Sequence, residues 1–173
     1  MITLISSTNR ANCQTLKLTQ FYQNILEQKG MASEIINLQN LPDNILGTDL
    51  YGARSEAFIP FQNAITQGKK FIFFIPEYNG SFPGVLKLFV DCLSFPESFF
   101  GKRVALVGLS AGTYGNIRGI DHFTGVCHYL GLHVMPGKIH IPFIKKELIG
   151  LEKKEENSSL KFIHQQIDEF LLF

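Results

Sequence analysis

The sequence predicts a three-layer α/β/α sandwich built around a parallel sheet. Apolar segments with the length of buried strands alternate along the chain with segments whose apolar residues recur at helical spacing. Two strand segments, residues 71–75 and 103–109, are apolar almost throughout, which is typical of strands buried on both faces. Because parallel strands require long right-handed crossovers, we expect a five-stranded parallel sheet of order 2-1-3-4-5 with helices on both faces.

A single domain, residues 1–173, is expected. A chain of 173 residues of which 45% are hydrophobic can form one full core and is short for two. The formal net charge of +1 gives no electrostatic reason to expect nucleic-acid binding. No apolar segment is long enough for a membrane span and the N-terminus does not resemble a signal peptide, so no membrane contact and a cytoplasmic location are expected.

The N-terminal segments follow a strand, loop and helix pattern. Residues 2–5 form a short apolar strand, and residues 6–12 are a polar loop rich in turn-forming residues. From residue 14 to 29 the apolar side chains recur at helical spacing, and Gly30 stands where a helix commonly ends. This region therefore places a helix N-terminus directly after the first polar loop.

The next segments lead to the central strand. Residues 33–38 are predicted to form the second strand, near a sheet edge. Residues 39–57 show weak periodicity, and we expect an irregular excursion that borders a ligand. Residues 60–67 are predicted as a short helix before the apolar strand at 71–75. Proline stops that strand, and polar residues follow it.

The second half of the chain repeats the alternation. Pro83 is suited to open a helix over residues 85–93, and Asn116 is suited to cap a helix over residues 117–130. Residues 133–141 are predicted as a last strand interrupted by a bend at Pro136 and Gly137.

The C-terminal segment is predicted to contain one helix. Residues 145–157 mix both charge signs and are expected to be a solvated connection. An apolar stripe over residues 160–171 then predicts a terminal amphipathic helix.

Polar loops follow three of the predicted strands, after Ile5, Ile75 and Leu109. In a sheet of order 2-1-3-4-5 these strands are neighbours, and the order reverses between the first and the third. Ligands of open α/β sheets bind in the crevice at such a reversal. We therefore expect all three loops to contact one ligand.

The first loop is suited to bind a phosphate. It ends at a helix N-terminus, which offers free amide hydrogens and the positive end of the helix dipole, and Arg10 adds a positive charge. The loop lacks the glycine-lysine-serine/threonine run of ATP-binding proteins and the glycine spacing of a dinucleotide fingerprint. These differences argue against ATP and against tightly held NAD.

The cysteines and histidines do not predict a metal site. Cys13, Cys92 and Cys127 are an odd number without metal-ligand spacing, which is typical of reduced thiols, and Cys92 and Cys127 are expected to pack in the core or at an interface. The histidines have no carboxylate or cysteine cluster around them at metal-ligand spacing.

Three motifs resemble one known family. The segment ISSTNR at residues 5–10, followed by Cys13 and Leu18, resembles the opening motif of the NADPH-dependent FMN reductase family. The segment PEYNGSFPGVLK at residues 76–87 is similar to the second signature of that family nearly residue for residue. The loop beginning at Ser110 is similar as well, and the resemblance extends from residue 1 to about residue 136.

This resemblance implies a flavodoxin-like fold and an FMN-dependent NAD(P)H oxidoreductase. Hydride passes from NADPH or NADH to bound FMN and then to a small-molecule acceptor such as a quinone, an azo compound, chromate or free flavin. No catalytic side chain is required, because the cofactor carries the chemistry. The resemblance places the FMN phosphate against Thr8, Arg10, Cys13 and Thr15. The ribityl chain and ring are expected against Pro76, Glu77, Tyr78, Asn79 and Gly80, with Ser110 and Gly112 on the other side.

Two other functions stay open at this point. Ser7 and Cys13 stand where the family usually has glycine and serine, which fits a binding module that kept the fold and lost the cofactor. The other alternative is a flavodoxin-like electron carrier that reacts with protein partners. Such carriers are typically acidic, and the near-neutral charge of this chain favours the reductase. In a reductase, Tyr78 and Tyr114 are candidates to shape the space shared by nicotinamide and acceptor.

The helix predicted after the second motif is a candidate subunit contact. The contact is expected through the helical segment 83–94, in which only Lys87 and Asp91 of residues 85–93 are clearly polar, and Phe95, Phe99 and Phe100 follow. A helix that is apolar on two adjoining faces needs two partners. Because members of the family are usually dimers or tetramers, a homodimer or homotetramer through this helix is expected. The alternative is a helix that a single chain covers completely.

Overall fold

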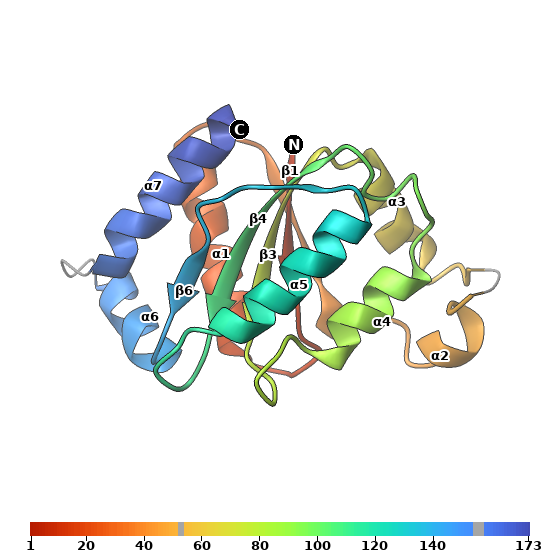
Figure 1. The fold of residues 1–173 in the computed structure, drawn as a ribbon, viewed down its shortest axis with the longest axis horizontal. Helices are drawn as coiled ribbons and strands as arrows, with labels where there is room; N and C mark the ends of the chain where they lie inside the picture. The colour runs from red at the N-terminus through yellow and green to blue at the C-terminus, as the bar shows by residue number, and fades with distance from the viewer. Residues whose placement is uncertain (52–53, 154–157) are drawn as a thin grey trace.

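The computed structural model describes residues 1–51, 54–153 and 158–173 (Figure 1). The strands are β1 (Ile2–Ser6), β2 (Ser33–Asn37), β3 (Lys70–Pro76), β4 (Arg103–Leu109), β5 (His133–Val134) and β6 (Ile139–Ile141). The helices are α1 (Gln14–Gln28), η1 (Leu38–Asn40), α2 (Ile45–Thr48), α3 (Ile59–Gln67), α4 (Gly84–Cys92), α5 (Ile117–Tyr129), α6 (Ile144–Glu152) and α7 (Ser158–Leu172).

The sheet is parallel and has the predicted order, β2-β1-β3-β4-β5. The fifth position is divided between two short strands. β5 pairs with the beginning of β4 at Arg103 and Val104, and β6 pairs with its end from Val107 to Leu109. The bend predicted at Pro136 and Gly137 separates them, so the described residues form a sheet of six strands, whereas the sequence predicts five.

A buried glutamine closes the gap between β5 and β6. Nε2 of Gln166 donates to the carbonyl of Leu106 at 3.2 Å and to that of Gly137 at 2.8 Å. Oε1 of the same side chain accepts a hydrogen bond from the hydroxyl of Tyr22 at 3.0 Å. Gln166 is 2% exposed, so these bonds satisfy polar groups that water does not reach.

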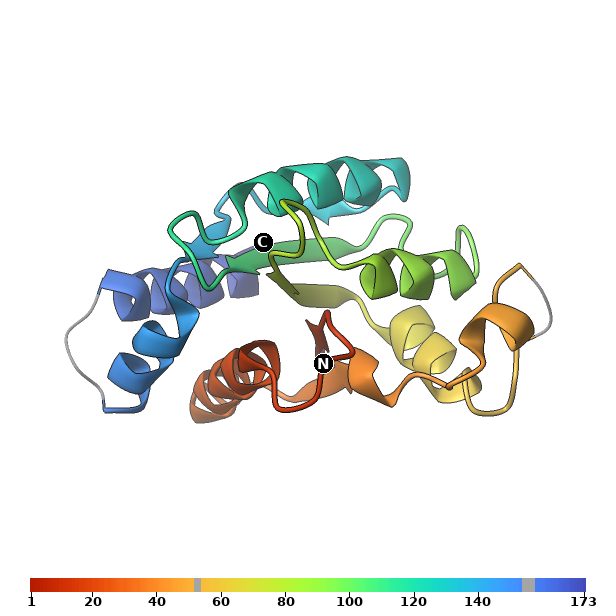
Figure 2. The same cartoon turned by 90° about the horizontal axis from the view of Figure 1, so that it is seen from below.

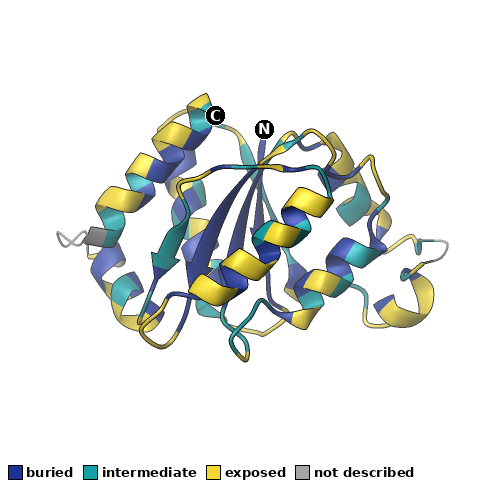
Figure 3. Ribbon diagram, in the orientation of Figure 1, coloured by how far each residue is buried: buried dark blue, intermediate teal, exposed yellow. Residues whose placement is uncertain are grey.

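Helices cover both faces of the sheet. One apolar cluster joins the sheet to α3, α4 and α5 through residues such as Ile65, Phe89 and Phe123. The other joins it to α1, α6 and α7 through residues such as Leu18, Leu148 and Ile163. Figure 2 shows the sheet between these layers, and Figure 3 shows buried strands beneath helices whose outer faces are exposed. The predicted three-layer sandwich is confirmed.

Helix α4 is largely covered by its own chain. Leu86, Phe89, Val90 and Cys92 are buried. On the solvent side, Lys87 and Asp91 form an ion pair at 2.7 Å. Among the aromatic residues that follow, Phe99 belongs to the core, whereas Phe95 and Phe100 are exposed. The apolar surface that α4 leaves for a second subunit is therefore small, and consists of its half-buried residues Val85 and Leu88.

Two connecting segments are more regular than expected. The prediction of a solvated connection over residues 145–157 is wrong for its first part, because α6 extends to Glu152. Ile144, Leu148 and Leu151 recur at helical spacing and are buried, a stripe that the surrounding charges obscure. Residues 154–157 lie outside the described residues. The excursion at 39–57 contains part of η1 and the one-turn helix α2, and residues 52–53 lie outside the described residues.

The packing roles predicted for Cys92 and Cys127 are confirmed. Both side chains are buried in the cluster beneath α4 and α5. Burial raises the pKa of the Cys92 thiol to about 11 and that of Cys127 to about 12. Both thiols therefore stay protonated at neutral pH.

Candidate cofactor-binding site

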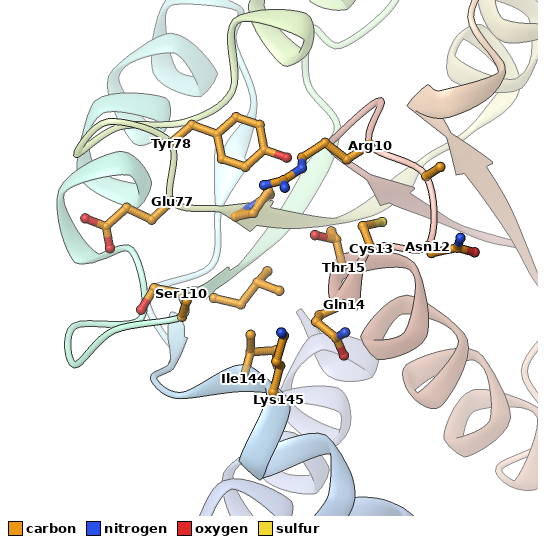
Figure 4. Close-up of a pocket in the computed structure, with 14 residues that line it drawn as sticks. Arg10, Asn12, Cys13, Gln14, Thr15, Glu77, Tyr78, Ser110, Ile144 and Lys145 are labelled. Atoms are coloured by element: carbon orange, nitrogen blue, oxygen red, sulfur yellow. The ribbon is translucent and has the colours of Figure 1, made fainter.

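The three polar loops meet at one hollow at the carboxyl ends of the strands (Figure 4). Its volume is about 360 Å³. The lining residues come from the β1–α1 loop, from the ends of β3 and β4, and from the start of α6. They are Arg10, Ala11, Asn12, Cys13, Gln14, Thr15, Pro76, Glu77, Tyr78, Leu109, Ser110, Ala111, Ile144 and Lys145.

Helix α1 begins at the wall of this hollow. Cys13 occupies the N-cap position in an extended conformation, and its Sγ accepts a hydrogen bond from the amide of Leu16 at 3.4 Å. The first turn contains no acidic residue. The positive end of the helix dipole therefore faces the hollow without a neutralising carboxylate in that turn. This arrangement favours an anionic group at the wall that Cys13 and Thr15 form.

The segment after β3 is a tight hairpin. The amide of Tyr78 donates to the carbonyl of Ser81 at 2.9 Å, and the amide of Ser81 donates back to the carbonyl of Tyr78 at 3.0 Å. The two central residues, Asn79 and Gly80, have φ values of 50° and 75°. Positive φ at both positions is what a two-residue type I′ turn requires, and Asn-Gly is its preferred sequence.

The side chain of Tyr78 turns back toward the β1–α1 loop. Its hydroxyl lies 2.5 Å from Oγ1 of Thr8, and that oxygen also accepts a hydrogen bond from the amide of Arg10 at 3.3 Å. The Arg10 guanidinium carbon lies 5.9 Å from the centre of the Tyr78 ring, within the range of a cation–π contact. Thr8 is buried and does not line the hollow, unlike the other three residues predicted to surround the phosphate.

The loop after β4 is held by its own side chains. Oγ of Ser110 donates to the carbonyl of Gly112 and accepts from the amide of Gly115, both at 2.9 Å. As predicted, Asn116 caps α5, and its Oδ1 accepts from the amide of Gly119. Its Nδ2 donates to the carbonyl of Ile75 at 2.9 Å, which ties this loop to the end of β3.

A second hollow of about 410 Å³ adjoins the first. The two share Glu77, Ser110 and Ala111. The second hollow is also lined by Asn79, Gly80, Gly112, Thr113 and Tyr114. The predicted ring-binding residues thus divide between two adjoining hollows, with Glu77 and Ser110 at the boundary.

The start of α6 forms a further wall of the hollow, which the mixed charges of this segment obscure in the sequence. The amide of Ser110 donates to the carbonyl of Ile141, and the amide of Ile144 donates to the carbonyl of Ser110. The amide of Phe143 donates to the carbonyl of Gly112 at 3.0 Å. These bonds bring Ile144 and Lys145 into the lining. The one sequence signal for this placement is the apolar stripe of α6, which begins at Ile144.

The charges that line the first hollow are mostly positive. Arg10 and Lys145 contribute cations, and Glu77 contributes the one carboxylate of the lining. Figure 4 shows Arg10 and Lys145 extending into the hollow from opposite walls, whereas the carboxylate of Glu77 points away from it. Together with the N-terminus of α1, these side chains suit an anion of the size of a phosphate.

Residues 1–51, 54–153 and 158–173 contain neither a cluster of metal-ligating side chains nor a helix able to span a membrane. No group of three or more His, Cys, Asp or Glu side chains in this part of the chain is placed to hold a metal ion. Its helices are likewise too short or too polar to cross a bilayer.

Comparison with known sequences gives one consistent family. A family model described as NADPH-dependent FMN reductase matches residues 1–146. An NAD(P)H-dependent FMN reductase of Pseudomonas aeruginosa is 32% identical over 107 residues, which are 60% of this chain and 57% of that protein. A 2-hydroxy-1,4-benzoquinone reductase of a Burkholderia species is 34% identical over 100 residues, 53% of this chain and 55% of that protein. The chain thus spans little more than half the length of these relatives.

Solved structures share the fold over nearly the whole chain. An NADH:FMN oxidoreductase in its apo form superposes with a TM-score of 0.79 and 22% identity, covering 99% of this chain and 88% of that one. The flavoenzyme NAD(P)H:(acceptor) oxidoreductase of Paracoccus denitrificans gives a TM-score of 0.65 at 17% identity, covering 98% and 97% of the two chains. At these identities the likeness concerns the fold alone.

Proposed function

The chain belongs to the NADPH-dependent FMN reductase family, and on this basis we propose that it binds FMN and uses NAD(P)H to reduce a small-molecule acceptor. The observation that carries the proposal is the meeting of the three motif-bearing loops at two adjoining hollows, one of which has a positively charged wall at the N-terminus of α1. A flavin mononucleotide has the matching division into an anionic end and a flat ring.

The residues present fit FMN. Arg10, Cys13 and Thr15 line the wall where α1 begins and would hold the phosphate. Pro76 and the hairpin that begins at Tyr78 would border the ribityl chain and the ring. Ser110 and Gly112 would close the other side of the ring, and Thr8 would support the phosphate site from beneath.

In this proposal the protein binds and orients its ligands. Bound FMN would supply the acceptance and donation of hydride, which no side chain can perform. The loop held by Ser110 and Asn116 would keep one edge of the ring site rigid. Tyr114, which is 72% exposed at the second hollow, would border the space that the nicotinamide and the acceptor occupy in turn. Tyr78 is less suited to that role, because its hydroxyl is turned toward Thr8.

The proposed acceptors are small molecules that could reach the flavin ring in the space that the nicotinamide leaves. We propose quinones, azo compounds, chromate or free flavin as acceptors, with NADPH or NADH as donor. Two observations support this choice: one relative carries the name of a benzoquinone reductase, and one solved structure with the same fold is described as an azoreductase.

Anaerobic addition of NADPH to the FMN-loaded protein tests the function. Rapid loss of the oxidised flavin absorbance, with reoxidation by a benzoquinone, is the expected result. Bound flavin that NADPH does not reduce would favour an electron carrier instead. A protein that retains no flavin would be a binding module of the same fold.

We also propose that the chain is a single cytoplasmic domain that forms a homodimer through α4. The support is the partly exposed strip of Val85 and Leu88, next to the exposed Phe95. Light scattering after size exclusion should give twice the chain mass, and Leu88→Arg should give monomers. A monomeric unsubstituted protein at micromolar concentration would contradict the proposed homodimer. Sedimentation of the protein with membranes after cell lysis would contradict the proposed cytoplasmic location.

A further inference from the structure

Lys145 is held at the hollow by the backbone around it. It belongs to the first turn of α6, whose start is fixed to the β4 loop by hydrogen bonds from Ile144 to Ser110 and from Phe143 to Gly112, each at 3.0 Å. Ile144 and Leu148 are each 4% exposed and anchor the helix against the sheet. The position of Lys145 is therefore set by packing, even though its own side chain is exposed.

Lys145 does not form one of the ion pairs found among the described residues, which involve Lys29, Lys87 and Lys138. The only carboxylate in the lining of the hollow, Glu77, points away from it in Figure 4. The ammonium group of Lys145 instead extends into the hollow, opposite the guanidinium of Arg10 (Figure 4). An anion in the hollow would lie between two cations from distant parts of the sequence.

The β1–α1 loop offers fewer side-chain hydrogen-bond donors for a phosphate than its motif suggests. The Sγ of Cys13 caps α1 by accepting from Leu16, and a thiol is a weaker donor than the hydroxyl of serine. The hydroxyl of Thr8 is buried and bonded to Tyr78. A phosphate monoester carries about −1.5 to −2 charge at neutral pH, which one guanidinium does not balance.

We propose that Lys145 is a second cation for the 5′-phosphate of FMN and offsets the weak donor at Cys13. The inference rests on the proposed function, since it assigns a further residue to the same site. The ammonium would contribute a charge-assisted contact from α6, on the opposite side of the phosphate from Arg10. The phosphate would then be held between the N-terminus of α1 and the Lys145 side chain from α6.

The test compares FMN with riboflavin, which has the same ring and no phosphate. Lys145→Met should raise the Kd for FMN about tenfold and leave the Kd for riboflavin unchanged, because only the contact to the charged group is lost. Quenching of flavin fluorescence measures both constants without turnover. Lys146→Met is the matched control, since Lys146 is the next residue, is also exposed and does not line the hollow. Lys145→Arg should retain most of the affinity for FMN.

Salt provides a second readout. The affinity of the unsubstituted protein for FMN should fall more steeply with added NaCl than that of Lys145→Met, because one screened charge contact is missing from the variant. The affinity for riboflavin should hardly respond to salt in either protein.

Several outcomes would overturn the assignment. Equal weakening of FMN and riboflavin binding would mean that Lys145 supports the fold or the ring site. A Lys145→Met protein that binds FMN as Lys146→Met does, but has a raised KM for NADPH and not for NADH, would assign the lysine to the second nucleotide. An unsubstituted chain that binds neither flavin would refute the proposed function together with this inference, whereas unaffected FMN binding refutes the inference alone.

Discussion

The hydroxyl of Tyr78 lies 2.5 Å from Oγ1 of Thr8, a residue 70 positions earlier in the chain. This contact joins the hairpin after β3 to the loop before α1, which are the two loops that carry the longest motifs. The phosphate wall and the ring wall of the candidate site are thereby fixed relative to each other.

Tyr78→Phe removes the hydrogen bond to Thr8 and keeps the aromatic ring of the side chain. We expect the free energy of unfolding to fall by about 1 kcal/mol, the usual net value of one hydrogen bond. Affinity for FMN should fall as well, because both loops lose a mutual restraint. Urea denaturation and flavin titration measure the two effects. Tyr114→Phe, at an exposed residue of the neighbouring hollow, is the control, and equal behaviour of the two variants would argue against the link.

Cys13→Ser should stabilise the protein. Serine is among the preferred N-cap residues and its oxygen is a better acceptor for the amide of Leu16 than Sγ at 3.4 Å. We expect the free energy of unfolding to rise by up to about 1 kcal/mol relative to the unsubstituted protein. FMN should bind at least as tightly to the variant at pH 8. Weaker FMN binding by the serine variant would show that the thiol suits the site better than a hydroxyl. Cys127→Ser, in the core, should be destabilised.

FMN should protect one thiol from alkylation. Cys13 is half-buried and lines the hollow, whereas Cys92 and Cys127 are buried with raised pKa values. At pH 8 iodoacetamide should modify Cys13 first, because the thiolate is the reactive form and the other two thiols remain protonated. Saturating FMN should slow this reaction, as peptide mass spectrometry can measure. Equal rates with and without FMN would place the cofactor away from Cys13.

Gly115→Ala should be strongly destabilising. Gly115 has φ +55°, and an added Cβ would lie 2.6 Å from the carbonyl carbon of His140 and from the nitrogen of Ile141. Backbone atoms cannot move aside cheaply, so we expect a loss of about 2 kcal/mol or more. Gly112→Ala in the same loop is the control, because nothing lies within 4 Å of the added atom. Similar melting temperatures for the two variants would contradict the expected clash.

Asp49 should make stability depend on pH on the acid side. Burial acts to raise the pKa of its carboxyl, but hydrogen bonds from Thr48 and Ser55 and the charge of Arg54 outweigh burial, so the pKa lies below its usual range. The stabilisation is then fully present above the unfolded pKa of about 3.9 and is lost as pH falls through the lower folded value. Asp49→Asn should cost about 1–2 kcal/mol at pH 7.

The measurement for Asp49 is urea denaturation at several pH values. The difference between Asp49→Asn and the unsubstituted protein should narrow as pH drops below about 4. Asp43→Asn, at an exposed carboxylate nearby, should change neither the stability nor its pH profile. A constant difference at all pH values would mean that the charge of Asp49 is not the stabilising feature.

Local patterns are sufficient to predict the sheet and the meeting of the loops that line the hollow. The runs ending at Ile75 and Leu109 are apolar enough to be central strands, and parallel strands bring the loops that follow them to one edge. Asn116 marks the start of a helix through a local hydrogen bond to the backbone. These features depend on residues close together in the sequence, so they can be predicted without knowledge of tertiary contacts.

The remaining parts depend on contacts between distant residues. The charged neighbours of Lys145 predict a solvated connection, whereas its place at the hollow follows from hydrogen bonds of the adjacent backbone to Ser110 and Gly112. The direction of the Tyr78 side chain follows from Thr8, far away in the chain. Pro136 predicts the division of the last strand, but no local pattern indicates that Gln166 bridges the gap.

That division also affects how the sheet meets other chains. A long, regular edge strand offers a row of unpaired amides and carbonyls on which a foreign strand can add, the first step of many aggregation reactions. Here β5 has two residues and β6 has three, and Pro136 between them has no amide hydrogen to donate. Gln166 satisfies the buried carbonyls at the interruption. At the exposed edge, the interruption leaves only short stretches to which a foreign strand can add.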